Sequence, residues 1–185
     1  MYISDIYFEL KDGRRALLRS PKKEDTQGAL DFLYIVAGET DFLMSYPEEC
    51  RKYTAESEWN YLEQKNISEN EAMLVCIVEG RLVGNCEISF QQNLKTKHRA
   101  SVALGIIREF WNQGIGTRML QELIRLSQSR EDVLQVELDF IEGNNRARYL
   151  YEKMGFRITG IRPNAVRLKD GTLLNEYMMM KEIKK

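Results

Sequence analysis

The chain has few of the residues that build metal centres or disulfide frameworks. Its 185 residues include three cysteines, three prolines and a single histidine. The number of cysteines is odd, and no Cys-x-x-Cys spacing occurs among Cys50, Cys76 and Cys86, so we expect no metal site. Cys76 and Cys86 fall on strands that we expect to be adjacent. The two side chains could therefore face each other, although the favoured interpretation is that both are buried, reduced thiols.

A large excess of charge and long hydrophobic runs are missing too. The 27 basic and 28 acidic residues give a net charge of −1, which argues against a protein that coats nucleic acid. No run approaches the roughly 18 apolar residues of a membrane span, and the N-terminus lacks a signal-peptide pattern. We therefore expect a cytoplasmic protein with no membrane or nucleic-acid partner. The length predicts one domain over residues 1–185.

Residues 104–120 read as an apolar strand, a glycine-containing turn and an amphipathic helix. Gly114 and Gly116 can adopt backbone angles that are closed to other residues, so amide N–H groups can converge where the helix begins. The macrodipole favours negative charge there, which predicts a phosphate site; an ordinary strand-to-helix turn is the alternative. The P-loop and the dinucleotide fingerprint do not fit. No Lys-Ser or Lys-Thr pair follows, and Met119 stands where a third glycine is required.

Hydrophobic periodicity divides the rest of the chain into strands and helices. Ser20 and Pro21 mark a helix start, Thr54 caps the next helix, and Leu134 begins an alternation that places Val136 inward. We expect a hairpin or a single strand within 7–19, strands at about 72–78, 82–90, 99–108, 133–140, 156–162 and 172–181, and helices at about 22–37, 54–66, 114–129 and 144–154. The strands at 99–108 and 133–140 are joined through a helix, so they should be parallel.

A second motif, NNRARYLYEKMGF, occupies residues 144–156. It resembles the Asn-x-x-Ala-x-x-Leu-Tyr-x-x-x-Gly-Phe signature of the GCN5-related N-acetyltransferases (GNAT family), at about the usual distance from the glycine turn. That turn, WNQGIG at 111–116, is similar to the family's Gln/Arg-x-x-Gly-x-Gly/Ala pyrophosphate loop, with Trp111 in place of Gln or Arg. The resemblance covers residues 70–182, and more loosely the N-terminal third.

The resemblance implies an α/β (α+β) fold. Its sheet would be mixed and mostly antiparallel, with a central, splayed pair of parallel strands and about four flanking helices. The implied activity is that of an enzyme, an N-acetyltransferase that moves an acetyl group from acetyl-CoA to a primary amine by direct attack in a ternary complex. A catalytically weak acyl-CoA sensor or interaction module is the alternative. The acceptor, a small molecule or a peptide, is not specified, and a homodimer is one of the oligomeric states left open.

The resemblance also implies individual site residues. Tyr151 corresponds to the family's general acid, with a core tyrosine as the alternative, and Asn144 would contact the cofactor or only cap its helix. A backbone N–H near Ile107 would polarise the thioester carbonyl. The main chain of three residues would face pantetheine: Ile106, Ile107 and Arg108. The amides that would hold the pyrophosphate belong to Gln113, Gly114, Ile115, Gly116, Thr117 and Arg118. The side chain of Arg118 could add a positive charge near the phosphates, or it could simply be an exposed helix residue.

The general base is the least defined residue. Glu87 is the first candidate, because carboxylates on the central strands serve as bases in some relatives; Asp139 and Glu137 are alternatives. Glu87 is equally well explained as a solvated side chain. Four acids between the first two helices would attract a cationic amine or simply be solvated: Glu39, Asp41, Glu48 and Glu49.

Overall fold

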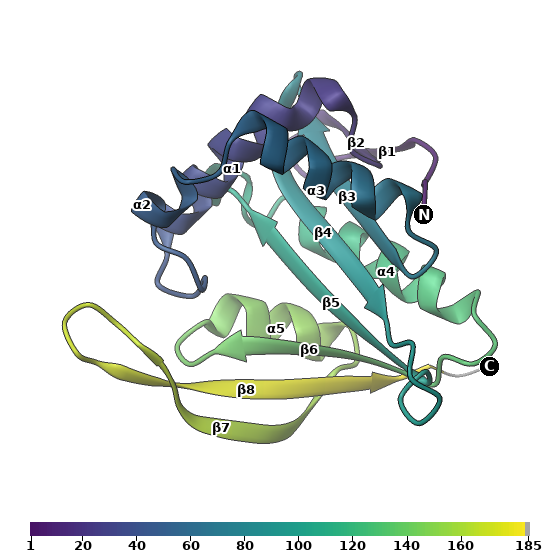
Figure 1. Cartoon of the computed structure of the whole chain (residues 1–185), viewed down its shortest axis with the longest axis vertical. Helices are drawn as coiled ribbons and strands as arrows, with labels where there is room; N and C mark the ends of the chain where they lie inside the picture. The colour runs from purple at the N-terminus through teal and green to yellow at the C-terminus, as the bar shows by residue number, and fades with distance from the viewer. Residues whose placement is uncertain (184–185) are drawn as a thin grey trace.

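The computed structural model describes residues 1–183, whose strands form one eight-stranded sheet in the order β1-β2-β3-β4-β5-β6-β8-β7 (Figure 1). Every neighbouring pair is antiparallel except β5 and β6, which are parallel. The strands are β1 (Ile6–Glu9), β2 (Arg15–Arg19), β3 (Glu71–Val78), β4 (Arg81–Phe90), β5 (Arg99–Ile106), β6 (Gln135–Ile141), β7 (Arg157–Arg167) and β8 (Leu173–Glu182).

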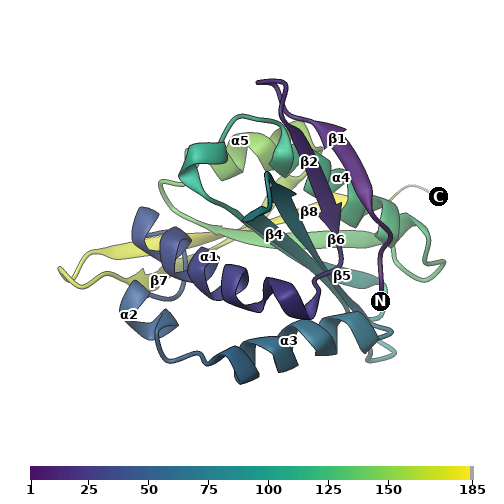
Figure 2. The same cartoon turned by 90° about the horizontal axis from the view of Figure 1, so that it is seen from above.

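Helices cover both faces of the sheet. Figure 2 shows α1 and α3 on one face and α4 and α5 on the other. The helices are α1 (Thr26–Glu39), α2 (Pro47–Cys50), α3 (Ala55–Ile67), α4 (Ile115–Gln128) and α5 (Asn145–Lys153). The predicted mixed fold, with its mostly antiparallel sheet and flanking helices, is confirmed. Among residues 1–183, no helix has the length and apolar character needed to cross a membrane.

The parallel pair β5 and β6 opens soon after it begins. Pairing is limited to Arg99–Ser101 opposite Gln135–Glu137. Beyond that point β5 stays paired with β4 as far as Ile106, and β6 stays paired with β8 as far as Ile141. Each strand keeps its outer neighbour while the two diverge from one another (Figure 1). The predicted splay of the central parallel strands is thereby confirmed.

The core explains why the central strands are so apolar. β3 lies between β2 and β4 and is covered on both faces, so Met73 and Leu74, whose side chains point to opposite faces, are both buried. Cys76 and Cys86 lie on these neighbouring strands as buried, free thiols. Burial raises the pKa of the Cys76 thiol to about 12, so it stays protonated at neutral pH.

Two predicted details are wrong. Ser20 does not cap the first helix, because its hydroxyl accepts the N–H of Ile3 at 2.8 Å; a short 3-10 helix at Lys23–Asp25 leads into α1, which starts at Thr26. Leu134 does not face inward and is 50% exposed, since it precedes the first residue of β6. By contrast, Thr54 caps α3 as predicted, and its hydroxyl accepts the N–H of Ser57 at 3.1 Å.

Candidate active site

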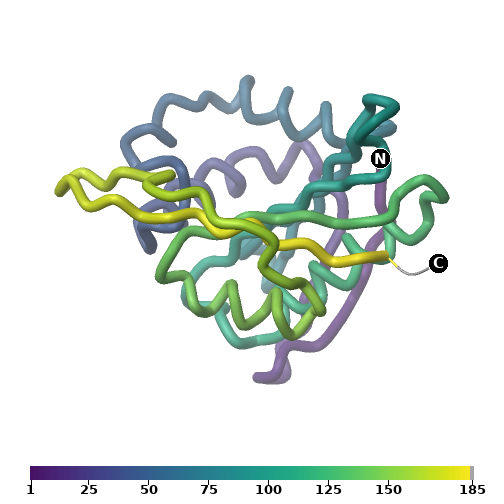
Figure 3. The backbone as a smooth tube through the Cα atoms, turned by 90° about the horizontal axis from the view of Figure 1, so that it is seen from below, coloured from purple at the N-terminus to yellow at the C-terminus, as the bar shows by residue number. Residues whose placement is uncertain are grey.

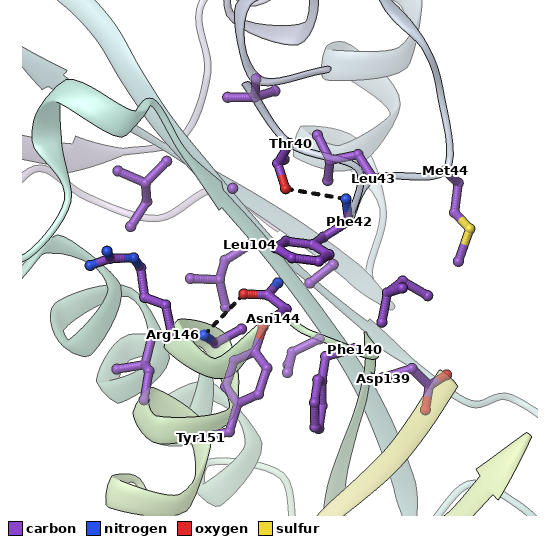
Figure 4. Close-up of a pocket in the computed structure, with 18 of the residues that line it drawn as sticks. Thr40, Phe42, Leu43, Met44, Leu104, Asp139, Phe140, Asn144, Arg146 and Tyr151 are labelled. Atoms are coloured by element: carbon purple, nitrogen blue, oxygen red, sulfur yellow. Dashed lines mark hydrogen bonds between the residues drawn. The ribbon is translucent and has the colours of Figure 1, made fainter. Parts of the chain in front are cut away.

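A cavity of about 340 Å³ occupies the gap between β5 and β6 (Figure 4). Its walls come from the two strands, from the start of α5 and from the segment after α1. Tyr151 and Asn144 line this cleft together with Leu104, Ile106 and Phe140. The fold therefore brings three of the residues predicted for the site to one cavity: Ile106, Asn144 and Tyr151.

The edge of β5 that faces the cleft has free main-chain donors. The N–H of Ile107 donates to the carbonyl of Val83 on β4 at 3.0 Å. Because alternate residues of a strand bond to opposite neighbours, the N–H groups of Leu104 and Ile106 point into the gap, where β6 is no longer paired. The carbonyl of Ile106 accepts the indole N–H of Trp111 at 2.7 Å. An extended ligand could pair with this edge as an added strand.

The structure corrects the predicted contacts of Ile107 and Arg108. The Ile107 amide is bonded to Val83, so it is not free to polarise a thioester carbonyl. The Arg108 amide donates to a carboxylate oxygen of Glu39 at 2.7 Å, and the Arg108 guanidinium donates to the Glu39 carbonyl. Among the three residues predicted to face pantetheine, the N–H of Ile106 points into the gap, whereas the N–H groups of Ile107 and Arg108 bind other parts of the protein.

The glycine turn presents a group of unpaired amides at the start of α4. Gly114 is the N-cap and has a φ of 95°, a conformation that glycine adopts without strain. The N–H of Arg118 is the first in the helix to reach a carbonyl, that of Gly114, at 3.1 Å. The amides of Ile115, Gly116 and Thr117 have no acceptor within residues 1–183. This is the backbone arrangement of an anion site.

Neighbouring segments hold the glycine turn in place. The carbonyl of Gln113 accepts the N–H of Lys11 at 3.3 Å, and its side-chain oxygen accepts the N–H of Asp12 at 3.2 Å. These bonds tie the turn to the β1–β2 hairpin. A Cβ at Gly116 would lie 2.8 Å from Cδ2 of Leu150, so glycine lets α4 approach α5 closely.

Arg118 differs from the simple surface residue of the alternative interpretation. Its guanidinium pairs with the buried Glu122 at 2.8 Å, and its Nε is buried without a partner in the described chain. A contact between Arg118 and phosphate stays a prediction. Nearer the turn, Arg146 lies 4.4 Å from the ring centre of Trp111 and donates to Asn112 at 2.6 Å, so positive charge does border the loop.

Tyr151 is held on the α5 side of the cleft and is 7% exposed. Its ring packs against Phe140 and Phe156, with centroid distances of 6.3 and 6.2 Å. Burial raises the pKa of its hydroxyl to about 12, so the group keeps its proton at neutral pH and can donate it. The side-chain oxygen of Asn144 accepts the N–H of Ala147 at 3.2 Å (Figure 4), which confirms the capping interpretation.

The three carboxylates considered as bases have different surroundings. Glu87 accepts the Tyr61 hydroxyl at 2.8 Å, pairs with Lys65 at 3.2 Å, and lines a second cavity on the α1/α3 face. Glu137 is held by Arg99 at 2.6 Å. Asp139 lines the cleft itself and has no hydrogen bond or ion pair in the described residues. Asp139 is exposed overall, but partial desolvation in the cleft wall, followed by the nearby Glu176 carboxylate, raises its pKa.

Tyr151 and Asp139 lie on opposite faces of β6. Phe140 packs against Tyr151, and successive side chains of a strand point to opposite faces, so Asp139 is directed to the side of α1 and α3. Figure 4 shows the two side chains on either side of Phe140. Phe42, Leu43 and Met44, from the segment after α1, line the same cavity. No motif in the sequence marked these three residues or the bond made by Trp111.

The acids between the first two helices are mostly engaged. Glu39 binds Arg108, the Glu49 carboxylate accepts the N–H of Tyr46 at 2.8 Å, and Glu48 pairs with Lys169. The N–H of Lys169 also donates to the Tyr46 hydroxyl at 3.1 Å, so the β7–β8 turn docks beside α2 (Figure 3). These three carboxylates hold loops in place, whereas the sequence had left open whether they attract a cationic amine or are simply solvated.

Comparisons with known proteins identify the family and the fold. The model of the acetyltransferase (GNAT) family matches residues 39–156, a range that includes the glycine turn and the second motif. A GNAT-family acetyltransferase from Streptococcus pneumoniae is 27% identical, with 91% of this chain and 99% of that one covered and a TM-score of 0.83.

Two more distant structures share the fold. A ribosomal-protein-alanine N-acetyltransferase from Brucella melitensis is 23% identical over 89% of this chain and 98% of its own, with a TM-score of 0.75. The yncA protein from Salmonella typhimurium, solved with its cofactor acetyl-CoA, is 15% identical over 92% and 95%, with a TM-score of 0.76.

Proposed function

Because the chain belongs to the GNAT acetyltransferase family, we propose that it transfers an acetyl group from acetyl-CoA to a primary amine as one N-acetyltransferase domain. The opening between β5 and β6 carries this proposal. A free strand edge and a buried tyrosine line this gap, and the helix N-terminus with its unpaired amides lies next to it, since Gly116 packs beside the side chains of Leu104 and Ile106. An acyl-CoA has an extended arm, a pyrophosphate and a thioester, and each of these features is the natural partner of one of those groups.

In this proposal the backbone binds most of the cosubstrate. The N–H groups of Leu104 and Ile106 pair with pantetheine along the β5 edge. The amides of Ile115, Gly116 and Thr117 hold the pyrophosphate with the help of the α4 dipole. A phosphate fits this site because the first three amides of α4 have no acceptors in the described chain, as is usual at the start of a helix.

The proton transfers are assigned to two side chains on opposite faces of β6. An amine acceptor arrives mostly as ammonium at neutral pH, and we assign Asp139 to remove the proton. Asp139 replaces Glu87 as the favoured base, because Glu87 lines the other cavity and is paired with Lys65. The amine nitrogen then forms its bond to the thioester carbon while the carbon–sulfur bond breaks. The Tyr151 hydroxyl gives its proton to the departing sulfur, and the nitrogen loses its second proton to the resulting phenolate as the amide forms. Asp139 then releases its proton to solvent.

Turnover with a panel of primary amines tests this function. Purified protein is mixed with acetyl-CoA and each amine, and free thiol and acetylated amine are measured together. We expect equal amounts of CoA and amide for at least one amine. Tight acetyl-CoA binding without any amide would favour the sensor alternative, and a failure to bind acetyl-CoA would contradict both functions.

A further inference from the structure

Glu58 on α3 is a buried carboxylate without a partner. It is 6% exposed, its side chain makes no hydrogen bond or ion pair with any residue in 1–183, and its oxygens open to the cavities that it lines. It lines two adjoining cavities, of about 230 and 490 Å³. Residues of α1 and α3, the helices that Figure 2 shows on one face of the sheet, form much of their walls. Burying a carboxylate is costly unless a cation or a donor compensates it. Burial alone raises the pKa of Glu58, since no nearby group offsets that cost.

The other charges near Glu58 are already matched. Glu87, the second acid in the smaller cavity, accepts the Tyr61 hydroxyl at 2.8 Å and pairs with Lys65 at 3.2 Å. Lys65 in turn reaches Glu71 at 2.6 Å. Apolar side chains such as Leu33 supply most of the remaining wall. Within the described lining of both cavities, Glu58 is the carboxylate left for a ligand.

The smaller cavity adjoins the proposed reaction cleft. The two share part of their walls, namely Val36, Leu43 and the β5 segment 103–105. Glu58 does not line the cleft that holds Tyr151 and Asp139. A cationic group bound at Glu58 is therefore separate from the amine that reacts beside Tyr151.

We propose that Glu58 binds a second cationic group of the acceptor, which makes the acceptor a diamine or polyamine. One amino group reaches the cleft, where Asp139 takes its proton, while another stays charged at Glu58. The apolar wall between the two positions suits the methylene chain that joins the amino groups. This inference rests on the proposed acetyltransferase function, and it adds the class of substrate.

A matched pair of amines and a matched pair of variants test the inference. Cadaverine and pentylamine have the same carbon chain, but pentylamine lacks the second amino group. We expect the wild type to prefer cadaverine over pentylamine in kcat/KM by about tenfold or more, because the buried carboxylate is compensated only by the diamine. Glu58→Gln should bring this ratio close to one. Glu63→Gln, at an exposed acid of the same helix, should keep it.

Binding gives a readout that does not depend on turnover. Calorimetry of cadaverine into the protein with bound CoA should show binding by the wild type and by Glu63→Gln, with at least tenfold weaker binding by Glu58→Gln. Equal use of both amines by the wild type, or an unchanged ratio in Glu58→Gln, would overturn the diamine inference and leave the proposed function standing. Glu58-dependent binding without acetylation would instead overturn the function and keep the cation site. Loss of a buried charge should not unfold Glu58→Gln, and a thermal melt checks this.

Discussion

The two sides of the cleft are built in different ways. The side formed by β5, α4 and α5 offers mainly backbone groups: the free edge of β5 and the amides that follow Gly114. The side toward α1 and α3 offers side chains, chiefly the carboxylates of Asp139 and Glu58. A backbone site requires a particular conformation, whereas a side-chain site can change its specificity through single substitutions. We infer that the first side binds the shared cosubstrate and the second selects the acceptor.

The largest expected effect is a loss of kcat, without a loss of stability, when the Tyr151 hydroxyl is removed. Tyr151→Phe should lower kcat by about 10²- to 10⁴-fold, the usual contribution of a positioned acid. The free energy of unfolding should hardly change, because the hydroxyl has no hydrogen-bond partner within residues 1–183 and the ring packing is kept. Steady-state kinetics and urea unfolding measure the two quantities. Tyr149→Phe, at a residue that is 71% exposed on the same helix, serves as the control, and equal losses in both variants would contradict the assignment.

A smaller effect is expected on the acceptor side at Asp139. Asp139→Asn should lower kcat/KM by about 10²-fold with acetyl-CoA binding unchanged. The wild-type rate should rise with pH as the Asp139 carboxyl loses its proton, at a pKa above the ordinary range for aspartate. The wild-type rate should not fall again until the pH approaches about 12, where the Tyr151 hydroxyl loses its proton.

The pH profile of the variant is the sharper observation. Asp139→Asn should lack the acidic limb of the kcat/KM profile, which then reports only the titration of the amine itself. A Glu87→Gln variant should keep that limb. The opposite pattern, with the limb lost in Glu87→Gln and kept in Asp139→Asn, would return the role of base to Glu87.

The smallest predicted effect concerns the brace between the glycine turn and β5. Trp111→Phe keeps an aromatic ring near Arg146 but removes the indole N–H that binds the Ile106 carbonyl. The free energy of unfolding should fall by about 1 kcal/mol, the net value of one hydrogen bond. Urea denaturation measures it, and an unchanged midpoint would show that the bond contributes nothing.

The geometry of the glycine turn and of the helix that carries Tyr151 could be predicted from the sequence because its signals are local. Gly114 and Gly116 stand close together in one turn, and the motif that carries Tyr151 lies on a single helix. The splayed strands also followed, through the family resemblance carried by these two motifs. The bonds of the Ile107 and Arg108 amides could not be predicted, because their acceptors, Val83 and Glu39, are distant in the sequence. The contacts of the other predicted residues with acetyl-CoA stay predictions.

The acceptor side could not be predicted in this way. Glu58 looks like any acid in the first turn of an amphipathic helix, and its burial depends on α1 packing beside it. Glu87 was placed on the correct strand, but its pairing with Lys65 follows from a contact between α3 and β4. Leu134 shows the same limit, since a fully regular alternation does not tell where strand pairing begins.

The central claim is that acetyl-CoA binds across the gap between β5 and β6 with its phosphates on the amides after Gly114. Thermal unfolding with and without acetyl-CoA tests it most directly. At about 100 times its dissociation constant the ligand should add about 2.7 kcal/mol, or roughly 5–10 °C for a chain of this size.

Two glycine variants make this measurement specific. Gly114 and Gly80 both have positive φ, and each has open space at the position that a Cβ would occupy, so valine should strain both turns alike. We predict that Gly80→Val keeps the shift in midpoint caused by acetyl-CoA and that Gly114→Val loses it. No shift in the wild type, or an equal shift in both variants, would contradict the account.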